Sequence, residues 1–265
     1  MQHDRIRLEA HGNVSVMTLN DPSVLNAFGH FLRLDMTEAL DAIEASDARC
    51  LVITGAGRAF CSGANLNDKH RPPRDRAAEL RGEVKSDLES WYNPTFIRLR
   101  DLNIPIVTAI NGIAAGAGMS LALSGDIKIA GRSATFLQAF ARIGLVPDCG
   151  SSYILPRLIG MARAMELSLL AERLPAETAL QWGMINRVVD DAELMPKAME
   201  MATGLANGPR SLGLIRRMYW ESVDNTYEQQ LDAESRLQKQ AGMTADYNEG
   251  VTAFREKRPA RFTGR

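Results

Sequence analysis

The chain of 265 residues has few cysteines and few histidines. Its three cysteines are Cys50, Cys61 and Cys149, which form no CxxC pair, and its four histidines all lie within the first 70 residues. An odd, scattered set of cysteines argues against a disulfide framework and a zinc site, and it is typical of a reducing compartment. Beyond residue 70, the chain has no histidine for a catalytic triad or a metal cluster.

An excess of charge of one sign is also missing. Lysine and arginine total 31 against 32 acidic residues, which gives a net charge of −1. No overall basic field exists that would draw the chain onto nucleic acid, so we expect no such partner. Local basic groups, such as those at 255–258 with Arg261 and Arg265, indicate a solvated face, a phosphate contact or a subunit contact.

Long apolar runs are scarce as well. The first twelve residues carry charges where a signal peptide needs an apolar stretch. One uncharged run, 102–125, is long enough to span a bilayer, but asparagine, proline and glycine interrupt it. We therefore expect strand, turn and helix there, no membrane partner, and a cytoplasmic location.

The composition that is present fits a globular domain with a sizeable core, since 45% of the residues are hydrophobic and 24% are charged. Short β-branched runs alternate with amphipathic segments, which predicts an α/β core over 1–190 and an all-helical region over 191–265. Strands are expected at 6–8, 14–19, 50–54, 104–110 and 127–130. Helices are expected at 29–45, 88–102, 116–123, 151–158, 162–170, 176–182, 192–206, 209–222, 226–240 and 245–256. The stretch 55–86 is either a solvated loop, with some helix near 77–84, or a flap over a pocket.

Two segments of small residues follow expected strands. The run from Asn111 to Gly118 opens a helix, where backbone N–H groups are free and the helix dipole is positive. It lacks the third glycine of a dinucleotide site and the lysine of a phosphate loop. The run from Phe60 to Leu66 could present a second N–H group, for instance that of Ala64. The pair is either an oxyanion site or close packing between helix and strand.

A third segment, 144–150, places Asp148 after a proline and two residues before a glycine. This is an ordinary turn pattern. Its functional interpretation is a carboxylate in an apolar pocket with Phe140, Leu145 and Val146 as walls. Burial would raise the pKa of that carboxylate and make it a usable base near neutral pH.

Together these segments resemble the crotonase (enoyl-CoA hydratase/isomerase) superfamily, and the resemblance covers nearly the whole chain. The matching stretches are 19–22 (LNDP), 25–27 (LNA), 54–64 (TGAGRAFCSGA), 109–112 (AING), 114–118 (AAGAG), 125–126 (GD), 143–147 (IGLVP), 249–254 (EGVTAF) and 257–258 (KR). The resemblance implies an α/β spiral of ββα turns with a helical C-terminal region that packs trimers, often paired into hexamers. It also implies an acyl-CoA thioester as substrate. Coenzyme A is then part of the substrate, and no separate cofactor or metal is expected.

The resemblance also implies the site residues. Two backbone N–H groups, those of Ala64 and Ala117, would bind the thioester oxygen, and Asp148 would be the catalytic carboxylate. The expected substrate and coenzyme A contacts are Val24, Leu25, Ala27, Ser62, Asn65, Leu66, Asn67, Gly116, Phe140 and Lys257. Lys257 would reach the coenzyme from a neighbouring subunit.

Departures from the family pattern predict which reaction is catalysed. Ser120 and Phe140 stand where typical hydratases carry their two glutamates, and Asn65 replaces the usual aspartate of its loop. Asp148 stands where several isomerases of the family place a single carboxylate. We therefore expect an acyl-CoA isomerase, which shifts an enoyl double bond or rearranges a ring epoxide. The alternatives are a 2-enoyl-CoA hydratase with Asp148 working alone and a non-catalytic acyl-CoA-binding member.

Overall fold

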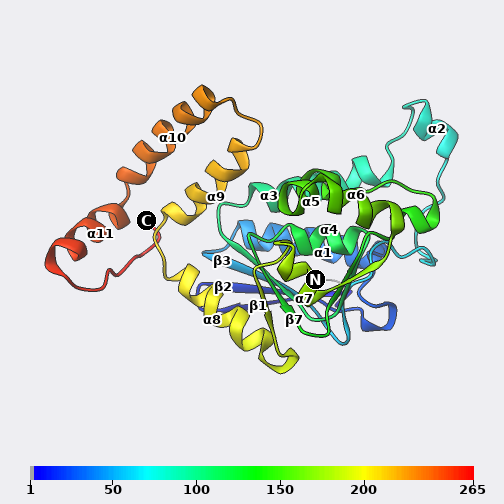
Figure 1. Ribbon diagram of the computed structural model, residues 1–265, viewed down its shortest axis with the longest axis horizontal. Helices are drawn as coiled ribbons and strands as arrows, with labels where there is room; N and C mark the ends of the chain where they lie inside the picture. Colours follow the sequence, from blue (N-terminus) through cyan, green and yellow to red (C-terminus); the bar gives the residue numbers. More distant parts are fainter. Residues whose placement is uncertain (1–2) are drawn as a thin grey trace.

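A computed structural model describes residues 3–265 and confirms an α/β fold (Figure 1). Its larger sheet has six strands in the order β1-β2-β3-β5-β7-β10, and only β1 runs antiparallel to its neighbour. Their bounds are β1 (Ile6–His11), β2 (Val14–Leu19), β3 (Cys50–Gly55), β5 (Ile106–Ile110), β7 (Ile127–Gly131) and β10 (Arg187–Val189). The central strands β3 and β5 are mostly apolar and almost wholly buried, as expected for parallel strands covered on both faces.

A smaller sheet has the order β4-β6-β8-β9, with β9 antiparallel to β8. Its strands are β4 (Ala59–Cys61), β6 (Ile113–Ala115), β8 (Thr135–Leu137) and β9 (Arg173–Pro175). Each of β3, β5 and β7 is followed by a strand of this second sheet and then by helix. The chain therefore repeats a ββα turn, which is the spiral that the resemblance implied.

The helices expected from the sequence are present, and most of their ends differ by two residues at most. The expected helix 88–102 divides into a π-helical turn and an α-helix that begins at Asn93, and the helical part expected near 77–84 ends at Leu80. The α-helices are α1 (His30–Glu44), α2 (Arg76–Leu80), α3 (Asn93–Asp101), α4 (Ala117–Leu123), α5 (Ser151–Ile159), α6 (Met161–Leu170), α7 (Ala176–Gln181), α8 (Leu194–Ala206), α9 (Ser211–Ser222), α10 (Tyr227–Gly242) and α11 (Ala245–Glu256). A π-helical turn, η2 (Leu88–Tyr92), precedes α3, and 3-10 turns cover η1 (Pro22–Val24), η3 (Ala139–Ile143) and η4 (Asp191–Glu193).

Helix α8 packs on the core, on one face of the six-stranded sheet. Its buried alanines, among them Ala198 and Ala202, lie in one apolar cluster with Val52, Val107 and Ile129. The division expected at residue 190 falls before this helix. The part that extends away from the core consists of α9, α10 and α11 (Figure 1).

Helix α9 is tied to the core by a buried arginine. Arg216 donates from Nε to the Asp126 carboxylate at 2.7 Å, and its guanidinium also reaches the carbonyl oxygens of Leu99 (2.9 Å) and Leu102 (2.7 Å). Gly213 brings the helix so close that a Cβ there would lie 2.0 Å from the Asn103 oxygen. Along residues 3–265, no helix combines the length and apolar character needed to cross a membrane.

Candidate active site

The loop after β4 lies directly against the start of α4. Gly63 has φ of +94°, and a Cβ there would lie 2.7 Å from the Ala115 carbonyl oxygen and 3.5 Å from the Ala117 nitrogen. A Cβ at Gly118 would lie 2.1 Å from the Cys61 carbonyl oxygen. Both glycines are therefore required for this approach. The close helix–strand packing that the sequence left open is real, and it brings the Ala64 and Ala117 segments side by side.

The backbone around Ala64 leaves one N–H group free. Phe28 donates to the Gly63 oxygen at 2.7 Å, and Asn65 donates to the Phe28 oxygen at 3.2 Å, so the loop pairs on both sides of Ala64. Among the loop and turn hydrogen bonds of residues 3–265, none is donated by Ala64. Ala64 itself is exposed. Its N–H group is therefore available to a ligand.

Ala117 is the first residue of α4, where an N–H group has no partner within the helix. The preceding Gly116 has φ of +53° and donates to the Leu137 oxygen at 2.9 Å, which fixes how the helix begins. The helix is buried along its whole length. The N–H groups of Ala64 and Ala117 thus lie in neighbouring segments, as an oxyanion site requires.

The backbone of Asp148 is fastened to the same helix. Its carbonyl oxygen accepts hydrogen bonds from the Ser120 hydroxyl (3.1 Å), the Ser151 N–H group (3.0 Å) and the Ser151 hydroxyl (3.0 Å). Ser120 is fully buried one turn beyond Ala117. Ser120, which the sequence marked only as a lost glutamate, therefore holds the Asp148 turn in place.

The Asp148 side chain is half-buried, and its Oδ1 atom is buried without a hydrogen-bond partner. Burial raises the pKa of this carboxyl group above its usual range, and a hydrogen bond from the Cys149 thiol opposes that shift in part. Cys149 itself adopts a left-handed conformation, with φ of +53°. A carboxylate of this kind holds a proton near neutral pH more strongly than an ordinary aspartate does.

The apolar wall consists of fewer residues than expected. Phe140 is buried, and its ring lies 3.9 Å from where a Cβ of Gly116 would stand. Leu145 and Val146, by contrast, are 54% and 80% exposed, so in this chain the expectation that they form walls is wrong. Gly144 explains the difference, because its φ of +69° ends the preceding 3-10 turn just before these two residues.

The expected coenzyme segment 24–27 lies against the same loop. Ser62 donates from its N–H group to the Leu25 oxygen (3.0 Å) and from its hydroxyl to the Val24 oxygen (3.2 Å). Leu25 is left-handed and Ala27 is buried. Asn26, between them, is fully buried, and its amide bonds the Ala59 oxygen at 2.8 Å. These contacts hold the 24–27 segment beside the loop that carries Ala64.

The rest of the loop is more open. The Asn65 side chain accepts a hydrogen bond from the Asn67 N–H group at 3.1 Å, so the amide in place of the usual aspartate still orders its own loop. Leu66 is 60% exposed and Asn67 is exposed. Just beyond them, Asp68 bonds the His30 N–H group at the start of α1 (2.5 Å). This link ties the loop to that helix.

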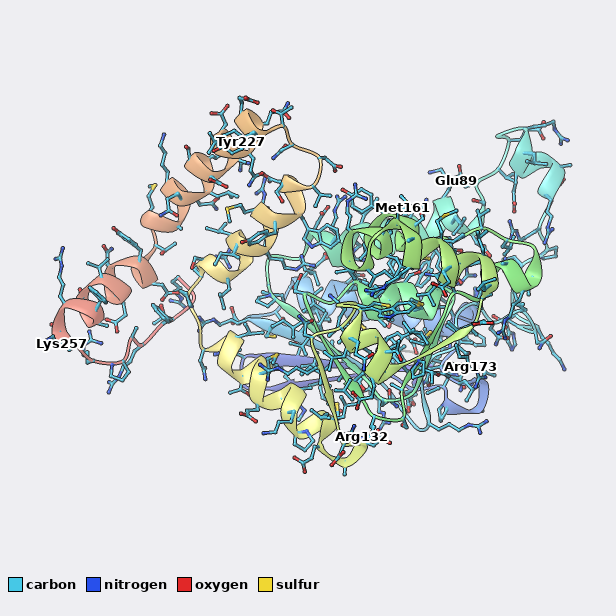
Figure 2. The ribbon with its side chains drawn as sticks, in the orientation of Figure 1. Glu89, Arg132, Met161, Arg173, Tyr227 and Lys257 are labelled. Atoms are coloured by element: carbon cyan, nitrogen blue, oxygen red, sulfur yellow. The ribbon has the colours of Figure 1, made fainter. Side chains whose placement is uncertain are left out.

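Lys257 lies far from the segments that carry Ala64, Ala117 and Asp148. It follows α11 and lies at the far end of the C-terminal extension from the core (Figure 2). In the basic segment around it, Arg258 pairs with Glu249 at 2.7 Å and with Glu256 at 2.7 Å, so its charge is largely compensated. Within residues 3–265, no three histidine, cysteine or acidic side chains cluster as a metal site would need.

One residue near Phe28, Tyr92, was given no role by the sequence. Tyr92 lies within a helical pattern, where periodicity does not distinguish it from its neighbours. In the structure its ring meets Phe28 edge-on, with centroids 5.8 Å apart. Only the tertiary packing of α3 and its preceding turn could have identified it.

Known proteins resemble this chain over almost its full length. The family model described as enoyl-CoA hydratase/isomerase matches residues 9–265. A 1,2-epoxyphenylacetyl-CoA isomerase of Escherichia coli is 48% identical over 254 residues, 95% of each chain. A protein of Rhodobacter capsulatus named as a probable enoyl-CoA hydratase is 41% identical over 266 residues, the whole of both chains. The solved enoyl-CoA hydratase of Bacillus anthracis superposes with a TM-score of 0.89 at 29% identity, covering 99% of this chain and 100% of the other.

Proposed function

The chain belongs to the enoyl-CoA hydratase/isomerase family, and from that premise we propose that it is an acyl-CoA isomerase. In this proposal the N–H groups of Ala64 and Ala117 bind the thioester carbonyl oxygen and Asp148 is the base. The observation that carries the proposal is the Asp148 carboxylate, which has a buried oxygen without a partner and a backbone fastened to α4.

The two N–H groups supply the electrostatic part of the mechanism. When a proton leaves C2 of the acyl group, negative charge develops on the thioester oxygen. Two fixed donors stabilise that enolate more than they stabilise the bound substrate. In comparable sites, one such donor contributes about 3 kcal/mol. The Gly63 and Gly118 contacts support this role, because they hold both segments in place before the substrate arrives.

Asp148 supplies the proton transfer. Its carboxylate takes the proton from C2 of a 3-enoyl thioester and returns it to C4, so that the double bond moves to the 2-position and all atoms balance. One carboxylate is enough for this exchange. A hydratase must also position a water molecule. The resemblance to the family puts Ser120 and Phe140, both buried here, at the two positions where typical hydratases carry glutamates.

Rearrangement of a ring epoxide is the finer form of the proposal, and the 48% identical isomerase supports it. Hydration is the second candidate, because the 41% identical relative bears the name of a hydratase. The non-catalytic alternative needs the oxyanion donors but not Asp148.

Substitution Asp148→Asn tests the proposal, since it keeps the shape of the side chain and removes the base. We expect turnover of a 3-enoyl-CoA to fall about 10²–10⁴-fold, while the dissociation constant of a saturated acyl-CoA changes little. Asp47→Asn, in the exposed turn after α1, is the matched control. Unchanged turnover in the Asp148→Asn variant would contradict the assignment of the base.

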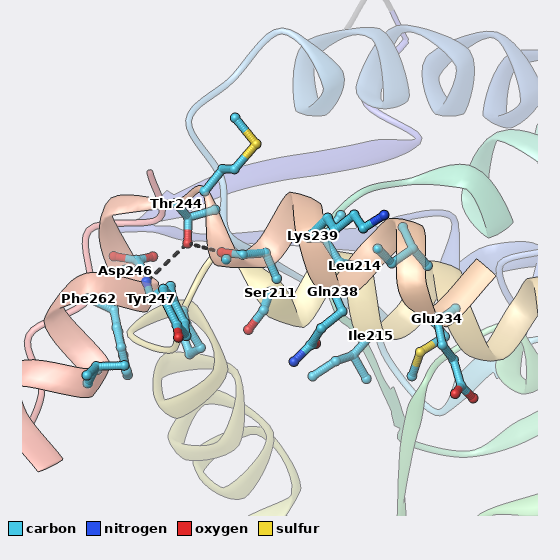
Figure 3. A pocket seen from close by; sticks show the side chains of 18 of the residues that line it. Ser211, Leu214, Ile215, Glu234, Gln238, Lys239, Thr244, Asp246, Tyr247 and Phe262 are labelled. Atoms are coloured by element: carbon cyan, nitrogen blue, oxygen red, sulfur yellow. Dashed lines mark hydrogen bonds between the residues drawn. The ribbon is translucent and has the colours of Figure 1, made fainter. Parts of the chain in front are cut away.

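We also propose a homotrimer or a dimer of trimers, assembled through α9, α10 and α11. An apolar groove of about 1370 Å³ lies between these helices, lined among others by Leu214, Ile215 and Tyr247 (Figure 3). Apolar side chains that line a groove on helices extending away from the core support a contact between subunits. Lys257 could then serve the coenzyme of a neighbouring copy, since it lies far from the core of its own.

A further inference from the structure

Strand β7 carries a buried lysine. Lys128 is 7% exposed, although lysine is almost never buried unless it is paired. It stands in register with Thr108 of β5, whose hydroxyl group donates to the Ala122 oxygen of α4 at 2.9 Å. Residues in register on neighbouring strands share a face of the sheet. The Lys128 side chain therefore lies on the face that α4 covers.

The ammonium group of Lys128 has too few partners. Its Nζ atom donates to the Gly125 carbonyl oxygen at 2.8 Å, and an ammonium group has two further N–H donors. Across residues 3–265, no acidic side chain forms an ion pair with Lys128, and the neighbouring Asp126 carboxylate is bonded to Arg216 at 2.7 Å. Burial lowers the pKa of Lys128, and the charge of Asp126 opposes that shift in part. A buried cation whose partner is a neutral oxygen is costly, so this position favours an anion from outside the chain.

A cavity opens beside this ammonium group, where α9 meets the core. Its volume is about 440 Å³, which is within the range of small-molecule sites. Lys128 lines it together with Gly125 and Asp126. The rest of the lining is mostly apolar and includes Ile154 and Leu158 of α5 and Ile215 and Trp220 of α9. The ammonium group is thus at the polar end of an apolar cavity.

The cavity carries a net positive charge. Its charged lining consists of Lys128, Arg157 and Arg216 against Asp126 alone. Arg216 is taken up by Asp126 and by backbone oxygens of the core, and Arg157 is exposed to water. Lys128 is therefore the buried cation that still has donors to offer. A ligand that suits both this group and the apolar lining has one anionic group and an apolar body.

We propose that this cavity binds an organic carboxylate with an apolar alkyl or aryl body, whose carboxylate group accepts hydrogen bonds from the Lys128 ammonium group. A carboxylate carries the single charge that one ammonium group balances, whereas a phosphate carries more than one. The site is separate from the proposed acyl-CoA site. Leu123, the last residue of α4, lines the cavity, whereas Ala117 is the first residue of that helix. The inference therefore does not depend on the proposed function.

Calorimetry with decanoate and decan-1-ol tests the proposal, because the two ligands share an apolar body and differ in the charged group. The wild-type protein should bind decanoate about tenfold more tightly than decan-1-ol, the size expected for a charged hydrogen bond. Lys128→Met keeps the length of the side chain and removes the charge, so it should lose that preference. Lys197→Met, exposed on α8, is the matched control and should keep it.

Two further measurements place the ligand. Leu158→Trp fills the cavity without touching the ammonium group, so it should weaken decanoate binding about tenfold even if Lys128→Met does not fold. Saturating decanoyl-CoA should leave the preference for decanoate unchanged, because it occupies the other site. The proposal is overturned if decanoate does not bind, if its preference survives Lys128→Met, or if decanoyl-CoA abolishes it.

Discussion

Asp148 combines a fixed backbone with a carboxylate oxygen that has no partner. Three hydrogen bonds to its carbonyl oxygen fix its backbone, whereas one of its carboxylate oxygens has no partner. A rigid backbone holds the side chain at one place, and a bare oxygen can accept a proton. The buried hydroxyl of Ser120 connects this turn to the helix that begins at Ala117, so the proposed base and one proposed oxyanion donor are held by the same helix.

The raised pKa of Asp148 predicts a specific pH dependence. The base must be ionised to act, so kcat/KM should rise with pH and level off only above that raised pKa, at a higher pH than an ordinary aspartate would give. Initial rates with a 3-enoyl-CoA between pH 4 and pH 9, relative to a buffer control, measure this profile. A profile already level at the usual pKa of aspartate would contradict the desolvated environment.

The same shift has a consequence for stability with a definite sign. Because the folded state binds this proton more tightly than the unfolded state, stability falls as pH rises through the interval between the two pKa values. Asp148→Asn removes the ionisable group and with it this loss of stability. The variant should therefore melt at a higher temperature than the wild-type protein at neutral pH, and the difference should disappear below the unfolded pKa.

At the residue scale, most of the predicted site residues came from the resemblance to the family. It indicated Ala64, Ala117 and Asp148, and the structure brings the segments of all three to α4. The walls assigned to Leu145 and Val146 were wrong, because residue type gives no information about which way a turn faces.

At the scale of elements, the contact between the β4 loop and α4 decides whether the two N–H groups converge. Substitution Gly63→Ala places a methyl group 2.7 Å from the Ala115 oxygen, at a backbone conformation that alanine disfavours. The segments must then separate, and we expect kcat to fall about 10²-fold or more, measured with a 3-enoyl-CoA.

Gly204→Ala is the matched control for that prediction. Gly204 lies within α8, and a Cβ there meets no atom within 4 Å. We expect it to stabilise the protein by about 0.5–1 kcal/mol, because alanine is the better helix former, and to leave turnover at the wild-type value. If both glycine variants kept full activity, the oxyanion role of this contact would be untenable.

Elements were predictable in proportion to their length and periodicity. The long amphipathic helices and the apolar strands β2, β3, β5 and β7 were expected. The second sheet was not, because β4, β6, β8 and β9 have three residues each and too short a run to show an alternating pattern. Those short strands carry the loops of the site, so its geometry could not be derived from local patterns.

At the scale of the whole molecule, Arg216 joins the helical extension to the core. Arg216→Ala would leave the Asp126 carboxylate without its cation and the buried carbonyl oxygens of Leu99 and Leu102 without their donor. We expect the free energy of unfolding to fall by about 3 kcal/mol, as measured by urea titration. Arg217→Ala, which breaks only an exposed pair with Glu221, should cost about 0.5 kcal/mol or less. Equal effects of the two substitutions would show that the Arg216 contact does not hold α9 in place.

The most direct test of the account follows the absorbance of the conjugated thioester when the purified protein meets a 3-enoyl-CoA and, separately, a 2-enoyl-CoA. An isomerase with Asp148 as its single base should raise the absorbance with the first substrate, because the double bond moves into conjugation, and should not lower it with the second. Loss of absorbance with the 2-enoyl-CoA would mean that water adds to the double bond, which would contradict the disabling role assigned to Ser120 and Phe140.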